Sequence, residues 1–453
     1  MAEFSTSEVC SSTEGQIIKS DGNVLFSGIC TDTRSVKAGD LFIALQGDQF
    51  DGHDFAAQAL LNGAAGVVVQ RSDLCGLGEG TVFLVKDTRK ALQNLAAFHR
   101  RRFQLPVIAI TGSNGKTTTK DLTASVLASR FHVLKTEGNF NNEIGLPLTL
   151  LNLTEDHDVA VVEMGMRGLG EIAELAQIGE PTAGIITNVG ETHMELLGSL
   201  ENIATAKSEL VSAIPQSGFV LLNDDDPYVK DMKRKALCRV ISYGMNPNCH
   251  IQASEITLTN HQTRFICRCF DQVFPVILPA VGKHNVYNAL AAIGAGWEMG
   301  LKAEEITKGL LYFQASSMRQ HIEQIREYTL INDAYNASPL SMASALDTLQ
   351  QVAQGRTVAV LGDMLELGDV AVDAHRRIGR LAAERGIQVV VSVGRLARYI
   401  SEAAKEAGVL QVIHCENHQQ ATDELNRILR PGDTVLIKGS RGMKMEQLVK
   451  MIG

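Results

Sequence analysis

Short apolar runs alternate along this chain with longer amphipathic stretches. Val107–Ile110, Val159–Val162, Ala183–Thr187 and Gly218–Leu222 are apolar runs of this kind, and helical spacing appears between them. Continuous apolar runs are typical of parallel strands that are buried on both faces. The pattern therefore predicts an α/β fold, in which helices flank a parallel sheet and ligands bind at the carboxyl ends of its strands.

The alternation recurs in three blocks, which we predict to be domains: residues 1–104, 105–318 and 319–453. In the first block, a small α/β unit, strands are predicted at 41–45, 66–69 and 81–85 and helices at 54–62 and 91–101. In the second, the period changes to 2 between about 238 and 281, which predicts an antiparallel excursion before a small-residue helix at 285–299.

The third block is Rossmann-like in pattern but contains no G-x-G-x-x-G motif. Its predicted strands are Thr329–Asn332, Thr357–Leu361, Val389–Val393, Gln411–His414 and Thr434–Ile437, and its predicted helices include 339–352 and 371–385.

Composition narrows the class of protein. The 453 residues are 45% hydrophobic and 21% charged, which predicts folded domains, and the net charge of −9 argues against nucleic-acid binding. The polar N-terminus does not resemble a signal peptide, and no apolar stretch is long enough to span a membrane. The scattered cysteines, with Cys267 and Cys269 on one face of a strand, indicate reduced thiols. We therefore expect a cytoplasmic protein.

The strongest chemical signal is the loop Thr111–Thr119, T-G-S-N-G-K-T-T-T, between a predicted strand and a helix. Backbone N–H groups at a helix N-terminus bind phosphate oxygens, and Lys116 adds a positive charge for the outer phosphates. The hydroxyl of Thr117 is placed to bind Mg²⁺. Ile110 stands where the standard Walker motif has its first glycine, so the match is imperfect. A glycine-rich turn without phosphate is the alternative.

Three further polar residues follow this loop in order. Glu163 ends the run Val159–Val162, where a Mg²⁺ ligand is expected beside a phosphate loop. His193 follows the next strand, and Lys207 lies in a helical segment. Alone, a histidine after a strand is more often a packing residue, a lysine on a helix is usually solvated, and the acid is as often a solvated strand end. The order of the four features therefore carries the interpretation.

At this point the chain resembles the Mur ligases, ATP-dependent amino-acid ligases of peptidoglycan precursor synthesis, over essentially its whole length. The phosphate loop resembles theirs, including its nonstandard spacing. Gly282–Ala291 resembles their G-x-H-N-x-x-N-x-x-A motif, and Asn332–Pro339 resembles the segment that holds the ribose. The resemblance implies an ATP site formed by Thr111, Gly112, Ser113, Asn114, Gly115, Lys116, Thr117, Thr118, His284, Asn285, Asn288, Arg319, Asp333, Tyr335 and Asn336.

The resemblance also implies roles. Lys116, Lys207, His193 and Arg319 correspond to catalytic positions, with Arg319 contacting phosphate. Thr117, Glu163, His193 and Lys207 correspond to the Mg²⁺ site. Members of the family carbamylate the lysine that matches Lys207, and an anionic carbamate would help to position Mg²⁺. The alternative is an unmodified ammonium that contacts phosphate directly.

Other segments point to the substrate. Residues 31–47 resemble the family's UDP-binding domain and 136–147 its muropeptide-facing loop, while the cationic turn 438–441 suits a carboxylate or phosphate unless it only caps a helix. The predicted substrate contacts are Thr33, Arg34, Gly47, Asn139, Asn141, Asn142, Lys438, Ser440 and Arg441.

Within the family, Leu361–Gly368 resembles the signature of the member that adds D-alanyl-D-alanine to UDP-N-acetylmuramoyl-tripeptide. The Asp-Asn-Pro-Arg motif of the member that adds a diamino acid to UDP-N-acetylmuramoyl-dipeptide is absent, and that member is the alternative. A nucleotide-dependent switch is a rival of another class, but the large third block argues against it. We expect ATP and Mg²⁺ as cofactors, the tripeptide and D-alanyl-D-alanine as partners, and a monomer.

Overall fold

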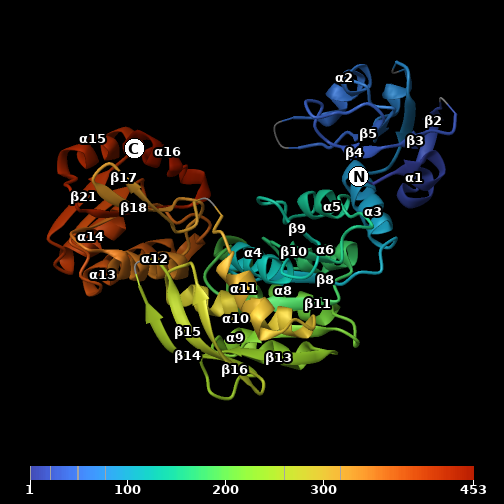
Figure 1. Cartoon of the computed structure of the whole chain (residues 1–453). Helices are drawn as coiled ribbons and strands as arrows, with labels where there is room; N and C mark the ends of the chain where they lie inside the picture. Colours follow the sequence, from blue (N-terminus) through green and yellow to red (C-terminus); the bar gives the residue numbers. More distant parts are fainter. Residues whose placement is uncertain are drawn as a thin grey trace.

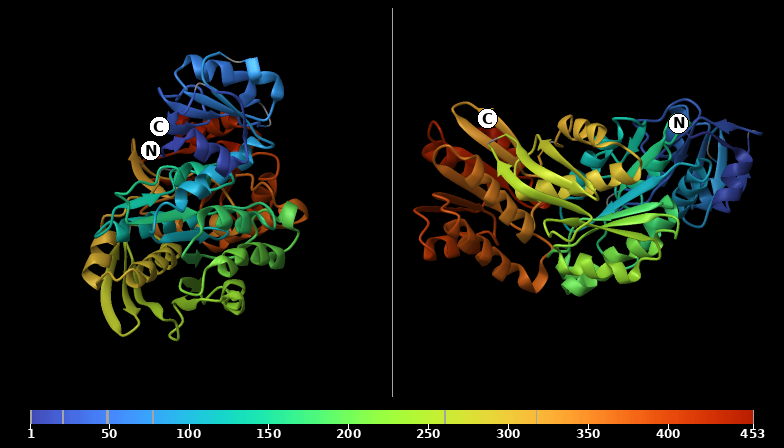
Figure 2. Two further views of the ribbon diagram at one scale, coloured as in Figure 1. Left: turned by 90° about the vertical axis from the view of Figure 1, so that its right-hand side faces the viewer. Right: turned by 60° about the horizontal axis from the view of Figure 1, so that its bottom comes forward.

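The computed structural model describes residues 2–20, 22–47, 50–76, 78–259, 261–316 and 318–452. The predicted α/β class is confirmed: successive stretches of the chain form separate sheets with helices on their faces (Figure 1). The first and third blocks lie at opposite ends of the second in both Figure 1 and the right-hand view of Figure 2. The domain boundaries themselves stay a prediction.

The first block forms a sheet of order β2-β7-β6-β5-β4, in which only β2 is antiparallel to its neighbour among the described strands. A short β1–β3 pair lies beside it. Its elements are β1 (Phe4–Ser5), α1 (Thr6–Thr13), β2 (Gln16–Lys19), β3 (Leu25–Phe26), β4 (Gly28–Cys30), β5 (Asp40–Ile43), η1 (Gly52–Phe55), α2 (Ala56–Leu61), β6 (Gly66–Val69), η2 (Ser72–Gly76), β7 (Thr81–Leu84) and α3 (Thr88–Arg100).

The second block forms the sheet β16-β15-β14-β13-β12-β11-β8-β10-β9. Its elements are β8 (Val107–Thr111), α4 (Lys116–Leu127), β9 (Val133–Lys135), α5 (Gly145–Leu150), β10 (Val159–Glu163), α6 (Glu171–Gly179), β11 (Ala183–Ile186), α7 (Met194–Leu197), α8 (Leu200–Ala213), β12 (Phe219–Asn223), α9 (Pro227–Asp231), η3 (Met232–Lys235), β13 (Arg239–Gly244), β14 (Ile251–Leu258), β15 (Thr263–Cys269), β16 (Gln272–Leu278), α10 (Lys283–Glu298) and α11 (Ala303–Leu311).

Strand β8 shows why its apolar run predicted a buried parallel strand. Val107 and Ala109 belong to the core on one face of the sheet, and Ile108 and Ile110 to the core under α4 and α10 on the other. The antiparallel prediction for residues 238–281 is correct for β14–β16 but wrong for β13, which runs parallel to β12. The connection through α9 and η3 returns the chain to the same end of the sheet, so β13 must run in the direction of β12.

The third block forms the sheet β17-β18-β22-β19-β20-β21, with β17 antiparallel to β18 and the other described neighbours parallel. Its elements are β17 (His321–Ile325), β18 (Tyr328–Asp333), α12 (Pro339–Val352), β19 (Thr357–Gly362), η4 (Gly368–Val370), α13 (Ala371–Glu384), β20 (Val389–Val393), α14 (Arg398–Glu406), β21 (Gln411–Cys415), α15 (His418–Ile428), β22 (Thr434–Lys438), η5 (Arg441–Met443) and α16 (Glu446–Ile452).

Helix α3 joins the first block firmly to the second. Leu92 and Leu95 lie in the same continuous core as Leu146 and Leu150 of α5. At its end, the buried guanidinium of Arg100 donates hydrogen bonds to the carbonyl oxygens of Gly179 (3.1 Å), Phe103 (2.7 Å) and Leu105 (3.1 Å). These contacts fix the first block against α6 and the start of β8.

We expect Arg100→Met to lower the free energy of unfolding by about 3 kcal/mol, because buried carbonyls lose their donor. The neighbouring Arg101, 61% exposed, pairs with Glu180 at 2.7 Å, so Arg101→Met should cost only about 0.5 kcal/mol. Urea unfolding followed by circular dichroism measures both. Equal midpoints for the two variants would contradict the bridging role of Arg100.

Candidate active site

The phosphate-loop sequence forms a tight turn between β8 and α4. Gly112 has φ +151°, and a Cβ there would overlap the hydroxyl of Thr187. Gly115 has φ +81° at the N-cap of α4, and its Cβ would lie 2.6 Å from Oδ1 of Asn288. Only glycine fits at both positions, so the backbone passes close to its neighbours and leaves the helix N-terminus directed at the site.

The end of β11 holds this loop in place. The backbone N–H of Ser113 donates to the carbonyl of Asn188 (2.9 Å), and that of Asn114 donates to Oδ1 of Asn188 (2.9 Å). The hydroxyl of Thr187 donates to the carbonyl of Asn114 at 2.6 Å. The loop is therefore shaped by a second strand end as well as by its own glycines.

Two polar groups of α4 lie at the strand ends. The ammonium of Lys116 donates to the carbonyl of Gly112 at 2.8 Å, and its pKa is lowered by burial and by Arg319, although Glu163 opposes this. The hydroxyl of Thr117 donates to the buried carboxylate of Glu163 at 2.8 Å. Asn141 donates its amide to the other oxygen of that carboxylate at 2.7 Å.

Lys207 is buried on α8, and its side-chain nitrogen forms no hydrogen bond or ion pair with any residue that the structure describes. Burial lowers its pKa well below the usual range, and the nearby charge of Lys116 lowers it further. A lowered pKa favours the neutral amine, which is the form that reacts as a nucleophile.

His193 lies at the start of α7 with φ +55°. Its Nδ1 is 2.6 Å from Oε2 of Glu366 in the third block. Burial lowers the pKa of its imidazole, with Glu366 acting in the opposite direction.

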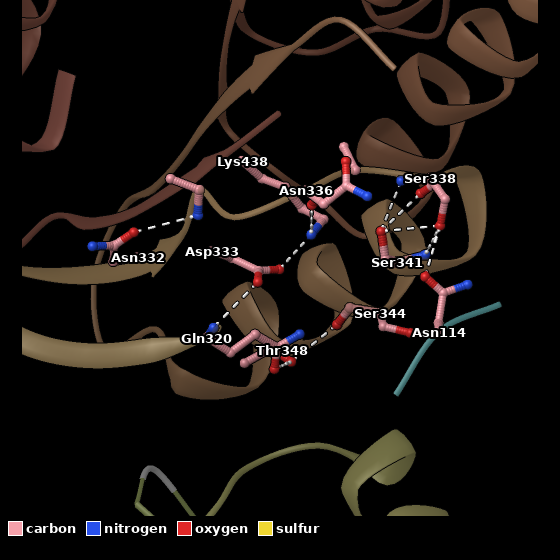
Figure 3. A network of polar contacts seen from close by, with 12 residues as sticks. Asn114, Gln320, Asn332, Asp333, Asn336, Ser338, Ser341, Ser344, Thr348 and Lys438 are labelled. Atoms are coloured by element: carbon pink, nitrogen blue, oxygen red, sulfur yellow. Dashed lines mark hydrogen bonds and ion pairs between the residues drawn. The ribbon is translucent and has the colours of Figure 1, made fainter. Parts of the chain in front are cut away.

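The third block contributes a network on the other side of the site (Figure 3). Asp333 ends β18, and its carboxylate accepts hydrogen bonds from Lys438 of β22 (2.7 Å) and from the backbone of Gln320 (3.2 Å). Lys438 also donates to the carbonyl of Asn336 at 2.8 Å. The guanidinium of Arg319 lies 3.9 Å from the ring centroid of Tyr335.

Hydrogen bonds connect the phosphate loop to α12 of the third block and to α10 of the second. Ser338, the N-cap of α12, donates to Oδ1 of Asn114 at 2.9 Å (Figure 3). From α10, Asn288 accepts from Thr119 at 3.1 Å and donates to Asn285 at 3.2 Å.

A single cleft of about 1710 Å³ collects most of the predicted site residues. The described residues that line this cleft range from Arg89 in the first block to Gly442 in the third. They include the phosphate loop from Ser113 to Thr118. It also includes Asn139, Asn141, Asn142, Glu163, His193, Lys207, His284, Asn285, Asn288, Arg319, Asp333, Tyr335, Asn336, Lys438, Ser440 and Arg441. Thr33, Arg34 and Gly47 lie in the first block and are not among the described residues that line it.

The turn after β22 serves partly to hold the third block together. Lys438 is 2% exposed and paired with Asp333, and the hydroxyl of Ser440 accepts from the backbone of Leu365 at 2.8 Å. The Arg441 side chain is exposed, beside Glu446. Of these three, Arg441 therefore keeps the most freedom to meet a ligand.

The donors around Thr117 suit a hard cation. A hydroxyl and a carboxylate oxygen lie 2.8 Å apart at the carboxyl ends of strands, and Mg²⁺ prefers such oxygens. Among the described residues, no three His, Cys, Asp or Glu side chains form a metal-binding group. A cation here would complete its shell with water and phosphate oxygens, as Mg²⁺ commonly does.

The sequence interpretation missed several residues. Asn188 and Thr187 follow a buried strand directly, and polar residues at a strand end were the available signal. Ser338 before Pro339 signals a helix N-cap, but its contact with Asn114 bridges residues far apart in sequence. Glu366 lies in the segment Leu361–Gly368, yet no pattern indicates its contact with His193.

Comparisons with known proteins agree with this fold and site. The Mur ligase family catalytic domain model matches residues 25–100, the Mur ligase middle domain model 110–296, and the Mur ligase glutamate ligase domain model 318–441. This chain belongs to the Mur ligase family, a family of ATP-dependent ligases.

Particular relatives share most of its length. It is 40% identical to the UDP-N-acetylmuramoyl-tripeptide–D-alanyl-D-alanine ligase of Bacillus subtilis over 93% of this chain and 92% of that one. A crystal structure of MurF from Acinetobacter baumannii, 32% identical, superposes with a TM-score of 0.92 over 99% of this chain and 98% of that one. MurF ligase from Thermotoga maritima in complex with ADP, 27% identical, gives 0.84 over 94% and 96%.

His284 gives this site a measurable pH dependence. Burial, with help from Lys438 and against Asp333 and Asp347, lowers the pKa of its imidazole to about 4. The unfolded chain binds a proton at His284 below about pH 6.5, whereas the folded protein does so only near pH 4. Stability is therefore lost as the pH falls through this window, by about 3 kcal/mol.

We expect His284→Asn to remove that part of the acid dependence, while His132→Asn, a change at an exposed histidine, keeps the original profile. Urea unfolding at pH 7 and pH 4.5 measures the difference. A variant at position 284 that loses as much stability on acidification as the parent protein would contradict the assignment.

Proposed function

We propose that this protein joins D-alanyl-D-alanine to UDP-N-acetylmuramoyl-tripeptide, with hydrolysis of ATP to ADP and phosphate, in peptidoglycan precursor synthesis. The observation that carries the proposal is one cleft in which the phosphate loop of the second block faces Arg319 and Asp333 of the third. The name of the Bacillus subtilis relative supports this reaction over the diamino-acid-adding alternative. The ADP-bound relative supports the binding of an adenine nucleotide.

The first step activates a poor electrophile. A terminal carboxylate oxygen of the tripeptide attacks the γ-phosphorus of ATP, the bond to the bridging oxygen breaks, and ADP leaves. Lys116 and the loop N–H groups stabilise the negative charge that develops on the transferred phosphoryl group, and Arg319 adds a cation from the third block. The product is an acyl phosphate, in which phosphate is a good leaving group.

In the second step, the free amine of D-alanyl-D-alanine attacks the acyl carbon. A tetrahedral intermediate forms, its nitrogen releases one proton, and it collapses to the amide as inorganic phosphate leaves. Water competes for the acyl phosphate, so the blocks must exclude it during the reaction. The contacts Ser338–Asn114 and Glu366–His193 connect the second and third blocks beside the site and support such closure.

Mg²⁺ is part of the proposal. Thr117 and Glu163 would hold it, with His193 and Lys207 nearby, and it would supply positive charge to the phosphate oxygens. Glu163 also keeps Thr117 and Asn141 oriented through its two carboxylate oxygens.

We further propose that Lys207 is carbamylated. In its neutral form, the buried amine would attack CO₂, forming an N–C bond and releasing one proton, and the resulting anion would suit the nearby positive charge of Lys116. The alternative, a direct ammonium contact with phosphate, would require burial of a charge that the site disfavours.

The remaining assignments concern the substrate and setting. Thr33, Arg34 and Gly47 would contact the UDP portion, and Asn139 and the two asparagines that follow, Asn141 and Asn142, the peptide. Arg441 would meet a carboxylate, with Lys438 and Ser440 supporting its loop. Reduced cysteines and the use of ATP favour the cytoplasm, and we propose a monomer. No helix of the described residues is both long and apolar enough to cross a membrane.

Phosphate release tests the reaction. We expect it to require ATP, UDP-N-acetylmuramoyl-tripeptide and D-alanyl-D-alanine together, and Lys116→Met to lower kcat by about 1,000-fold because a transition-state cation is lost. Lys233→Met, at an exposed lysine of η3, is the matched control and should retain full activity. Release with UDP-N-acetylmuramoyl-dipeptide and a free diamino acid instead would refute the proposal.

Carbon-13 NMR tests the carbamate. Protein equilibrated with ¹³C-bicarbonate should show a carbamate resonance that Lys207→Gln abolishes and Lys233→Gln leaves in place. An active, Mg²⁺-loaded enzyme without this resonance would show that Lys207 works as an unmodified amine.

A further inference from the structure

The turn that carries His193 is attached on both sides. Towards the phosphate loop, the hydroxyl of Thr192 donates to that of Ser113 at 3.2 Å. Towards the third block, the backbone N–H of Glu195 donates to the carbonyl of Glu366 at 3.2 Å. The turn therefore joins the phosphate loop to the segment Leu361–Gly368.

Both partners of the side-chain contact have an uncommon backbone. His193 has φ +55° and Glu366 has φ +62°, in the left-handed region that non-glycine residues seldom adopt. Close packing keeps them there: a Cβ on Gly368 would lie 3.1 Å from Cα of Glu195. Backbone conformations of this kind persist only where the surroundings hold them, and they concentrate at functional sites.

The contact selects one form of the imidazole. Oε2 of Glu366 lies 2.6 Å from Nδ1 of His193, although the two atoms are not aligned as a hydrogen bond. At this distance a carboxylate oxygen, which carries no proton, would repel a lone pair on the ring nitrogen. Nδ1 must therefore carry the proton, which leaves the lone pair on Nε2 for a ligand in the cleft that His193 lines. A second ion pair, Arg377 with Glu191, joins the blocks near the same turn without touching the imidazole.

We infer that Glu366 is a positioning residue for His193, which fixes the Nδ1–H tautomer and makes the orientation of this ligand depend on docking of the third block. The segment Leu361–Gly368 thereby acts on the site through His193. The inference rests on the proposed role of His193 at the divalent cation, and the experiment separates the two.

The test is Mn²⁺ binding to the full chain with a non-hydrolysable ATP analogue, followed by electron paramagnetic resonance. Glu366→Gly removes the carboxylate and tolerates the positive φ, and Glu366→Asn repeats the change with a side chain too short to reach. We expect both to weaken Mn²⁺ binding about tenfold. His193→Asn should weaken it at least as much, whereas Arg377→Gln should change it less than about twofold.

A second measurement excludes a merely structural effect. Nitrogen-15 NMR of histidine-labelled protein should show His193 in the Nδ1–H form, and a mixture of tautomers in Glu366→Gly with an unchanged thermal unfolding curve. If Glu366→Gly binds Mn²⁺ with normal affinity while His193→Asn binds it weakly, the positioning role of Glu366 is overturned. The role of His193 at the cation then still stands. Equal losses in Arg377→Gln and Glu366→Gly would also overturn it, since docking would then suffice. Normal affinity in His193→Asn would overturn the cation role of His193 itself.

Discussion

The structure depends on one constraint: parallel strands deliver the residues that follow them to the same edge of a sheet. In the second block, β8, β10 and β11 end at the phosphate loop, Glu163 and the Thr187–Asn188 pair. In the third, β18 and β22 end at Asp333 and Lys438, which pair at 2.7 Å. The carboxyl ends of both sheets border one cleft, so two separate cores supply a common set of polar groups.

The two junctions of the second block differ in kind. Towards the first block, α3 shares a continuous apolar core, and Arg100 adds buried hydrogen bonds. Towards the third, the contacts include polar pairs, such as Ser338 with Asn114 at 2.9 Å and Glu366 with His193 at 2.6 Å. Polar interfaces between domains commonly permit relative motion. This architecture therefore favours movement of the third block relative to the first and second blocks, which move together.

The local pattern of apolar and polar residues was enough to predict much of the fold, because a few residues suffice to identify a buried parallel strand or an amphipathic helix. Helix α12 and strand β20 begin and end where the pattern placed them. The short, half-buried β9 and the edge strand β17 were missed, since neither has a continuous apolar run. The orientation of β13 was wrong because direction is set by a crossover connection, which residue spacing does not record.

The candidate site divides in the same way. The phosphate loop, Glu163 and Asp333 lie at strand ends, and the sequence was enough to predict them as site residues. The partners of His193 and Lys438 were not, because each contact joins segments more than 100 residues apart. Such contacts depend on how strand ends and whole blocks meet, and that information is spread over many packing residues.

Part of the cleft is cationic, although acidic side chains line it as well. The protein carries a net charge of −9, yet Lys116, Lys207 and Arg319 gather on one cleft. Burial and mutual repulsion lower the pKa of both lysines, so holding them there costs free energy. A bound polyphosphate or a carbamate relieves that repulsion, and the stabilisation is greatest where the repulsion between the cations is greatest. The same positive charge that strains the folded protein thus supplies the differential stabilisation that phosphoryl transfer requires.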